Sequence, residues 1–245
     1  QKDKINFFAH KGGKMRKLAS KMRDSVEEAE SNKVDVRQED KTIGSFTIGI
    51  SECTKPLVEI TSLTVMKDHK PTTQKVQVTV RKKHRLLITG PNGIGKSTLL
   101  EAMAGKTEQG AIIPPEVKVG YYRQDFSGLD MQKTVYDTLA EVMEMPDHQK
   151  IYATASHFLL KGDKVKNVVG NLSEGQKGLL CFARFVLLQP TLLILDEPTN
   201  HINFRHLPVI AQALNKFEGG MILVSHDDEF VSQITMNEEL NLGTL

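Results

Sequence analysis

Eight consecutive residues, 90–97, have a composition suited to holding a polyphosphate. They read Gly-Pro-Asn-Gly-Ile-Gly-Lys-Ser, with a short apolar run at 86–89 before them and a helical pattern over 98–104 after them. Glycines let backbone N–H groups turn toward phosphate oxygens, and a helix N-terminus adds a favourable dipole. We expect Lys96 to reach the β- and γ-phosphates and Ser97 to bind Mg²⁺. The predicted phosphate-binding residues are Gly90, Pro91, Asn92, Gly93, Ile94, Gly95, Lys96, Ser97 and Thr98.

Two adjacent carboxylates end a second apolar run further along the chain. Residues 192–195 are Leu-Leu-Ile-Leu, and Asp196 and Glu197 follow them directly. A buried strand would present both acids at its C-terminal end, where ligands of open α/β sheets bind. We expect Asp196 to hold Mg²⁺, directly or through water, and Glu197 to polarise an attacking water. Alone this pair of carboxylates is weak evidence, but downstream of a phosphate loop it predicts hydrolysis of a nucleoside triphosphate.

A third segment, Leu172 to Gln176, reads Leu-Ser-Glu-Gly-Gln and precedes an apolar helical pattern. Ser173 and Gly175 would present a hydroxyl and backbone N–H groups at the start of that helix, which is an anion-binding arrangement. Taken by itself, the segment is an ordinary helix N-cap.

The elements that must position these residues are short buried strands alternating with helices. Strands are predicted at 86–89, 192–195 and 221–224, where the residues are continuously apolar, and at Val76 to Val80, where they alternate. Phe46, Ile48 and Ile50 also alternate and predict a strand. This pattern indicates an α/β fold with a mostly parallel sheet.

The order of the motifs is similar to that of the ATP-binding cassette family. Phosphate loop, Gln124, the segment at 172–176, the acid pair and His226 follow one another as in that family, over about Phe46 to Leu245. The resemblance implies a P-loop nucleotide-binding domain with a mostly parallel core sheet, an antiparallel β subdomain and a short helical subdomain. It implies ATP and Mg²⁺ as cofactors.

The resemblance also assigns roles. Gln124 lies in the loop that senses Mg²⁺ and the attacking water, and His226 contacts the γ-phosphate. The implied catalytic residues are Glu197, His226 and Gln124, and the implied metal ligands are Ser97, Gln124 and Asp196. Ser173, Gly175 and Gln176 belong to a signature that closes on ATP held by another cassette, either in the same parent chain or in a second copy.

Three features resemble the ABC-F branch of the family. Residues 197–203 read Glu-Pro-Thr-Asn-His-Ile-Asn, close to the Glu-Pro-Thr-Asn-His-Leu-Asp of that branch, and only 47 residues lie between Gln124 and Leu172. A basic helical arm before the cassette resembles the ABC-F linker. The branch implies a cytoplasmic translation factor acting on the ribosome, with rRNA and tRNA as partners and, in some members, protection against antibiotics.

The predicted arm occupies residues 1–42, and the cassette residues 43–245. Residues 1–23 carry eight Lys/Arg and one Asp, and Phe8, Met15 and Met22 recur at seven-residue spacing. Such a block favours a polyanion partner, although on charge alone a solvated helix face is an equal alternative. The beginning at Gln1, within this helical pattern, indicates a chain truncated at its N-terminus. The RNA-contact candidates are His10, Lys11, Lys14, Arg16, Lys17, Lys21 and Arg23.

Composition narrows the alternatives. No run of 18 apolar residues occurs, which predicts no membrane insertion, and the two cysteines, Cys53 and Cys181, fit a reducing compartment. The main alternative is the ATPase subunit of an ABC membrane transporter. A DNA-repair cassette is disfavoured because two cysteines cannot build a zinc module and the length excludes long coiled coils. A slowly hydrolysing ATP-dependent switch is a further alternative.

Two departures from the family pattern carry expectations. No Phe, Tyr or Trp occurs at 47–120 to stack on adenine, so Met66 or His69 would take that place and discrimination between ATP and GTP should be weak. Asn203 stands where the family commonly has Asp, which should weaken coupling between paired sites without removing nucleotide binding.

Overall fold

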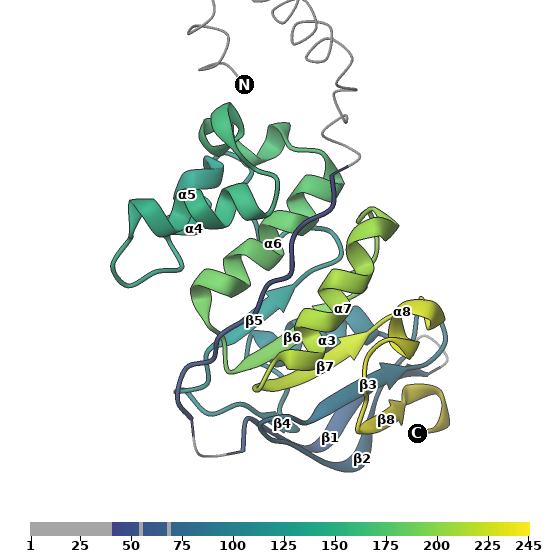
Figure 1. The fold of residues 1–245 in the computed structure, drawn as a ribbon. Helices are drawn as coiled ribbons and strands as arrows, with labels where there is room; N and C mark the ends of the chain where they lie inside the picture. Colours follow the sequence, from purple (N-terminus) through teal and green to yellow (C-terminus); the bar gives the residue numbers. More distant parts are fainter. Residues whose placement is uncertain (1–40, 54–55, 68–69) are drawn as a thin grey trace, which may run out of the picture. The chain divides into compact units, whose positions relative to one another are not determined.

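The computed structural model describes residues 41–245 except 54–55 and 68–69 (Figure 1). The chain divides into two units, Gln1–Lys41 and Thr42–Leu245, and the helices and strands of the described residues belong to the second. Residues 1–40 of the predicted arm, which include all of its RNA-contact candidates, lie outside the described residues.

The core of the second unit is a five-stranded sheet in which all neighbouring strands run parallel, in the order β5-β6-β7-β3-β8. Its strands are β3 (Arg85–Thr89), β5 (Val119–Tyr122), β6 (Leu192–Asp196), β7 (Gly220–Val224) and β8 (Glu238–Asn241). Every residue of β6 and β7 is buried, which explains their continuous apolar runs. The C-terminal ends of these strands lie at one edge, so the segments after β3, β5, β6 and β7 are brought together there.

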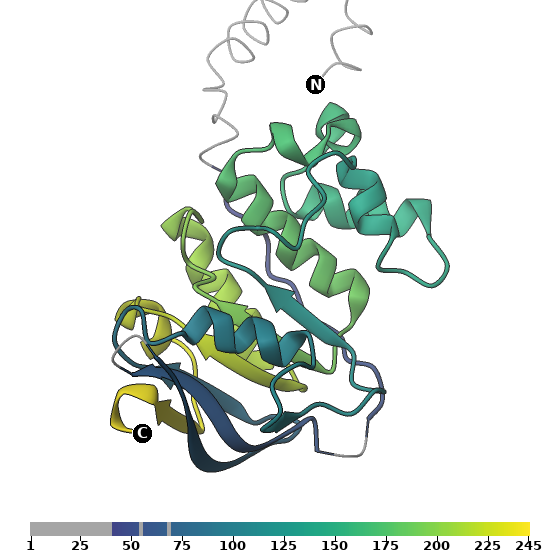
Figure 2. The same ribbon diagram turned by 180° about the vertical axis from the view of Figure 1, so that it is seen from behind.

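A second, antiparallel sheet has the order β2-β1-β4. Its strands are β1 (Val58–Lys67), β2 (Lys70–Val80) and β4 (Ala111–Ile112). In the view from behind, the helix α3 (Lys96–Ala104) lies in front of the parallel sheet (Figure 2). It shares one apolar core with both sheets, in which its Leu100 and Met103 join Leu63 of β1 and Ile194 of β6. The predicted α/β architecture, with a parallel core and an antiparallel part, is confirmed.

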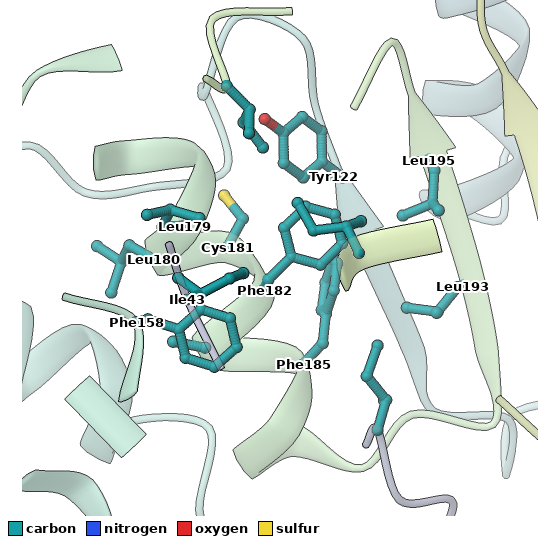
Figure 3. Packing of buried hydrophobic residues seen from close by; sticks show 14 of the residues in the cluster. Ile43, Tyr122, Phe158, Leu179, Leu180, Cys181, Phe182, Phe185, Leu193 and Leu195 are labelled. Carbon is teal, nitrogen blue, oxygen red and sulfur yellow. The ribbon is translucent and has the colours of Figure 1, made fainter. Parts of the chain in front are cut away.

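The opposite face of the parallel sheet packs against a second apolar core formed with the remaining helices. Leu193 and Leu195 of β6 face this side and meet Phe182 and Phe185 of α6 (Figure 3), while Ile194 faces α3. The helices are α4 (Val135–Ala140), α5 (His148–His157), α6 (Glu174–Leu188), α7 (Leu207–Lys216) and α8 (Asp228–Ser232). Short 3-10 turns are η2 (Gly162–Lys166), η3 (Val169–Asn171), η4 (Phe204–His206) and η5 (Leu242–Thr244).

The strand predicted at Phe46 to Ile50 is wrong. Residues 41–53 form no helix or strand and run as an extended segment along α6 (Figure 1). The alternation reflects burial against helices, because Ile48 is buried and the Phe46 ring lies 4.9 Å from that of Phe158. Helices bond their backbone groups internally and so offer an extended neighbour no ladder. The other predicted strands are present, as is the helix at 98–104.

Candidate nucleotide-binding site

The phosphate loop connects β3 to α3 through three glycines with left-handed backbone. Gly90, Gly93 and Gly95 have φ of 142°, 80° and 97°, values that side-chain-bearing residues rarely adopt. Gly95 is the N-cap of α3 and directly precedes Lys96. The loop conformation therefore depends on glycine at the spacing read from the sequence.

Lys96 is folded over its own loop. Its Nζ donates to the carbonyl oxygens of Gly90 at 2.8 Å and Pro91 at 3.2 Å. An ammonium group carries three hydrogens, so one remains for a phosphate oxygen. The loop carbonyls thus hold the charge of Lys96 beside the backbone N–H groups of the loop and of the α3 N-terminus, where an anion is favoured.

The strand β1 contacts the phosphate loop through Met66. The amide of Met66 donates to the carbonyl of Ile94 at 3.0 Å, and the Met66 Cγ lies 3.5 Å from the position a Cβ would take on Gly95. Met66 is 39% exposed, so part of its side chain remains accessible to a ligand beside the loop. His69, the other candidate for contact with the base, lies outside the described residues.

Asp196 ends β6 with a carboxylate that is 2% exposed. Its Oδ1 is buried without a hydrogen-bond partner among the described residues. Burial raises the pKa of Asp196, and the Ser97 hydroxyl and the Lys96 charge oppose that rise. A buried, unpartnered carboxylate oxygen beside a serine hydroxyl suits a hard divalent cation, which prefers oxygen ligands. These residues therefore fit Mg²⁺.

Glu197 comes next in a left-handed conformation, φ 48°, and is 6% exposed. Its Oε2 accepts from the backbone N–H of His226 at 3.1 Å, while its Oε1 lies 3.5 Å from His226 Nε2, too far for a well-formed bond. Burial raises the pKa of Glu197, and the bond from the His226 N–H opposes the rise. One carboxylate oxygen is thus fixed and the other is left to accept a proton, as a general base requires.

A pocket of about 340 Å³ gathers three of the predicted residues, Ser97, Gln124 and Asp196. Its other lining residues were not predicted from the sequence, and they are Glu101, Tyr121, Arg123, Asp125 and His201. Sequence spacing could have indicated most of them. Glu101 lies one helical turn after Ser97, and Tyr121, Arg123 and Asp125 lie within three residues of Gln124. Gln124 itself is exposed, just beyond β5.

The segment at 172–176 begins α6 with a capping box. Ser173 Oγ accepts from the Gln176 N–H at 3.3 Å, and the Gln176 side chain accepts from the Ser173 N–H at 3.1 Å. A Cβ on Gly175 would lie 3.0 Å from the His201 carbonyl oxygen, and Glu174 pairs with His201 Nδ1 at 2.7 Å. Ser173, Gly175 and Gln176 do not line the pocket. His201 connects this segment to it.

Asn203 caps η4 by accepting from the Arg205 N–H at 3.0 Å. Asn and Asp serve equally well at such a cap, so the departure from Asp leaves the local backbone intact.

Comparisons with known proteins agree with this geometry. The family described as "ABC transporter" matches residues 73–200, just over half of the chain. ABC transporter F family member 5 of Arabidopsis thaliana is 36% identical over 166 residues, covering 66% of this chain and 24% of that protein. ATP-binding cassette sub-family F member 2 of Mus musculus is 30% identical over 252 residues, 95% of this chain and 38% of its own length. The chain thus spans well under half the length of these relatives.

Solved structures show the same fold. A putative ABC transporter ATP-binding protein from Pyrococcus furiosus superposes with a TM-score of 0.59 at 22% identity, covering 76% of this chain and 98% of that one. A structure titled "Model of ribosome-bound archaeal Pelota and ABCE1" gives a TM-score of 0.57 at 21% identity, covering 81% of this chain and 34% of that one. Within the part of the chain that the structure describes, no helix is both long and apolar enough to cross a membrane.

Proposed function

The chain belongs to the ABC family, as an ATPase cassette of the ABC-F type, and from this premise we propose that it hydrolyses Mg²⁺-bound ATP. In this proposal it does so while paired with a second cassette and bound to the ribosome. One observation supports the chemistry above all others. The ends of parallel strands carry the phosphate loop after β3, Asp196 and Glu197 at β6, and His226 after β7. Hydrolysis of a bound triphosphate uses this combination of anion cradle, metal ligand and base.

Each residue has a separate task in the proposal. Lys96 and the loop N–H groups bind the phosphates, and Glu197 takes a proton from the attacking water through its free Oε1. Ser97, Asp196 and Gln124 would hold Mg²⁺, which when bound would offset negative charge on the phosphates. His226, with its side chain 56% exposed beside Glu197, would contact the γ-phosphate.

The second cassette completes the site. Ser173, Gly175 and Gln176 lie at the N-terminus of α6, outside the lining of the chain's own pocket, and would close on ATP held by the partner. The partner is a cassette of the same parent chain or a second copy.

The ribosome is the proposed site of action, in the cytoplasm. The F-subfamily relatives and the 197–203 segment support this, as does the +7 charge of residues 1–23. Phosphate contacts by Lys and Arg bind RNA strongly and with high salt sensitivity. We assign contact with rRNA and tRNA to Lys11, Lys14, Arg16, Lys17, Lys21 and Arg23. Protection of ribosomes from antibiotics is the narrower form of this proposal.

Co-sedimentation with ribosomes tests the proposal. The full-length protein would carry Glu197→Gln and the equivalent change in its other cassette, because the amide fills the same space but cannot act as a base and so keeps ATP bound. We expect ATP-dependent, salt-sensitive binding that is lost when Lys14, Lys17 and Lys21 are neutralised.

A matched control neutralises three exposed lysines of the cassette, Lys82, Lys161 and Lys166. This variant should still bind ribosomes, because the same loss of charge falls outside the arm. If the full-length protein with all of its arm lysines intact does not bind ribosomes in ATP, the ribosomal role is contradicted and the transporter ATPase is favoured. Equal loss in both lysine variants would contradict a specific role of the arm.

A further inference from the structure

Gln124 occupies the pocket without a hydrogen bond of its own. Gln124 is exposed and shares the lining of the pocket with Ser97 and Asp196, yet no described residue bonds to its side chain. A metal ligand must be held in place by its surroundings, and outer partners of ligands usually do this. What positions Gln124 must therefore act through its neighbours in the chain.

Arg123, the residue before Gln124, is anchored on three sides. Its Nη1 donates to Glu101 Oε1 and lies 3.4 Å from Ser127 Oγ, and its Cζ lies 4.8 Å from the centre of the Tyr121 ring. The bond to Glu101 raises the pKa of Arg123, whose guanidinium is charged at any ordinary pH. Glu101 belongs to α3, one turn beyond Ser97, so this pair joins the Gln124 loop directly to the helix of the phosphate loop.

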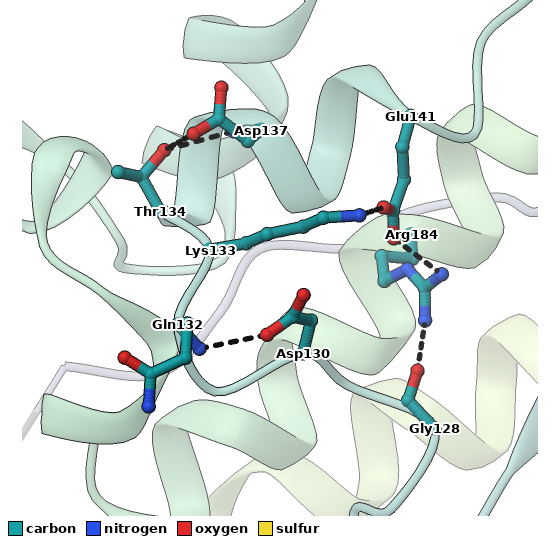
Figure 4. Close-up of polar contacts among 8 residues, drawn as sticks. All are labelled: Gly128, Asp130, Gln132, Lys133, Thr134, Asp137, Glu141 and Arg184. Atoms are coloured by element: carbon teal, nitrogen blue, oxygen red, sulfur yellow. Dashed lines mark hydrogen bonds and ion pairs between the residues drawn. The ribbon is translucent and has the colours of Figure 1, made fainter.

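The far end of the same loop is tied to α6. The carbonyl of Gly128 accepts from Arg184 Nη1 at 3.4 Å, and Arg184 Nη2 pairs with Glu141 at 3.0 Å (Figure 4). Lys133 reaches the other oxygen of Glu141 at 2.6 Å. Residues 123–128 are thus held at both ends, and the Arg123 end is the one inside the pocket.

We propose that Arg123 is a positioning residue that, through Glu101, holds Gln124 within reach of the metal bound by Ser97 and Asp196. The proposal rests on the proposed Mg²⁺-ATP site. An ion pair this exposed contributes little to stability, since the side chains of Arg123 and Glu101 are 29% and 59% exposed. Its main effect should be on the geometry of the metal site.

The test measures Mn²⁺ binding by electron paramagnetic resonance in the presence of ATP, using the full chain. Removing a group that is hydrogen-bonded to a metal ligand typically costs about 10- to 100-fold in metal affinity, and because Arg123 acts through the backbone beside the ligand we take the lower end of this range. We expect Arg123→Gln and Glu101→Gln each to weaken Mn²⁺ binding at least about tenfold, and the double variant to be no weaker than either single change, because all remove the same pair. Arg123→Lys should recover part of the loss.

Binding of ATP in EDTA provides the second readout and should stay within about twofold of the original chain in every variant. Lys83→Gln, which breaks an exposed ion pair with Glu218 away from both the pocket and residues 123–128, is the matched control and should leave Mn²⁺ binding unchanged. Normal Mn²⁺ binding in Arg123→Gln would overturn the proposal, as would equal loss of metal-free ATP binding, which indicates general damage. Failure of the unmodified chain to bind ATP would instead refute the proposed function itself.

Discussion

Replacing Asp196 by Asn should make the free protein more stable while removing its response to Mg²⁺. The carboxylate is 2% exposed, and its Oδ1 lacks a partner among the described residues. Because burial raises its pKa above the unfolded value, the ionised group at neutral pH destabilises the folded chain, and stability rises as pH falls through the folded pKa. An amide of the same shape removes the buried charge.

The size of the gain can be worked out from general costs of burial. An unsatisfied buried polar group costs about 1–3 kcal/mol, and a charged one costs more. The lost attraction to Lys96 and the Ser97 bond offset part of this, so we expect a gain of about 1–2 kcal/mol. At roughly 2–4 °C per kcal/mol for a chain of this size, the melting temperature should rise by about 2–8 °C.

Thermal unfolding in EDTA and then with ATP, with and without Mg²⁺, measures both effects. Mg²⁺ should add to the stabilisation by ATP in the original chain but not in Asp196→Asn. Asp125→Asn is the control, because Asp125 lines the same pocket but is exposed and accepts from the Ser127 N–H, which lowers its pKa. A variant Asp196→Asn that is no more stable in EDTA, or still responds to Mg²⁺, would refute the reasoning.

Three further outcomes are expected from the structure. ATP and GTP should compete almost equally for the original chain, and Met66→Tyr should tighten nucleotide binding by adding a ring beside Gly95 on which the base can stack; strong ATP preference in the original chain would contradict this. Gly178→Ala should lower the free energy of unfolding in denaturant by about 1–3 kcal/mol, because its Cβ would lie 2.8 Å from Ile202 Cγ1. An unchanged midpoint would show that Ile202 can move aside without cost. His206 is buried and its pKa is lowered by burial, so on acidification this histidine is protonated more readily in the unfolded chain than in the folded one. The free energy of unfolding should therefore fall as pH drops below about 6.5. His206→Gln should flatten that dependence when unfolding is measured at several pH values.

Part of the candidate site could be proposed from the sequence because the segments that carry it lie at the ends of short apolar strands. Asp196 ends β6, Glu197 follows it, and the phosphate loop follows β3, so local patterns propose these residues without knowledge of tertiary contacts. Gln124 and His226 were proposed from the family resemblance. Parallel strands then bring these ends together at one edge, where Ser97, Gln124 and Asp196 line one pocket, and the roles of these residues stay predictions.

Features that depend on tertiary contacts were not predictable from the sequence. The Arg123–Glu101 pair joins residues far apart in the chain, and its side chains belong to two elements whose packing no local pattern specifies. Arg85 is similar: it is buried at the start of β3 and donates to the carbonyls of Leu214, Asn215 and Phe217 at the end of α7. The strand predicted at Phe46 to Ile50 is wrong because burial of an extended segment against helices gives the same alternation as burial in a sheet.

The most direct test of the central claim compares the full-length protein with Glu197→Gln in ATP binding and in steady-state phosphate release. The structure predicts that the variant binds ATP as tightly as the original protein while turnover falls by about 10²-fold or more, because a positioned general base contributes about 10²–10⁴ in rate. Equal turnover in both proteins, or no binding of ATP by either, would contradict the assignment of this site as an ATP-hydrolysing cassette.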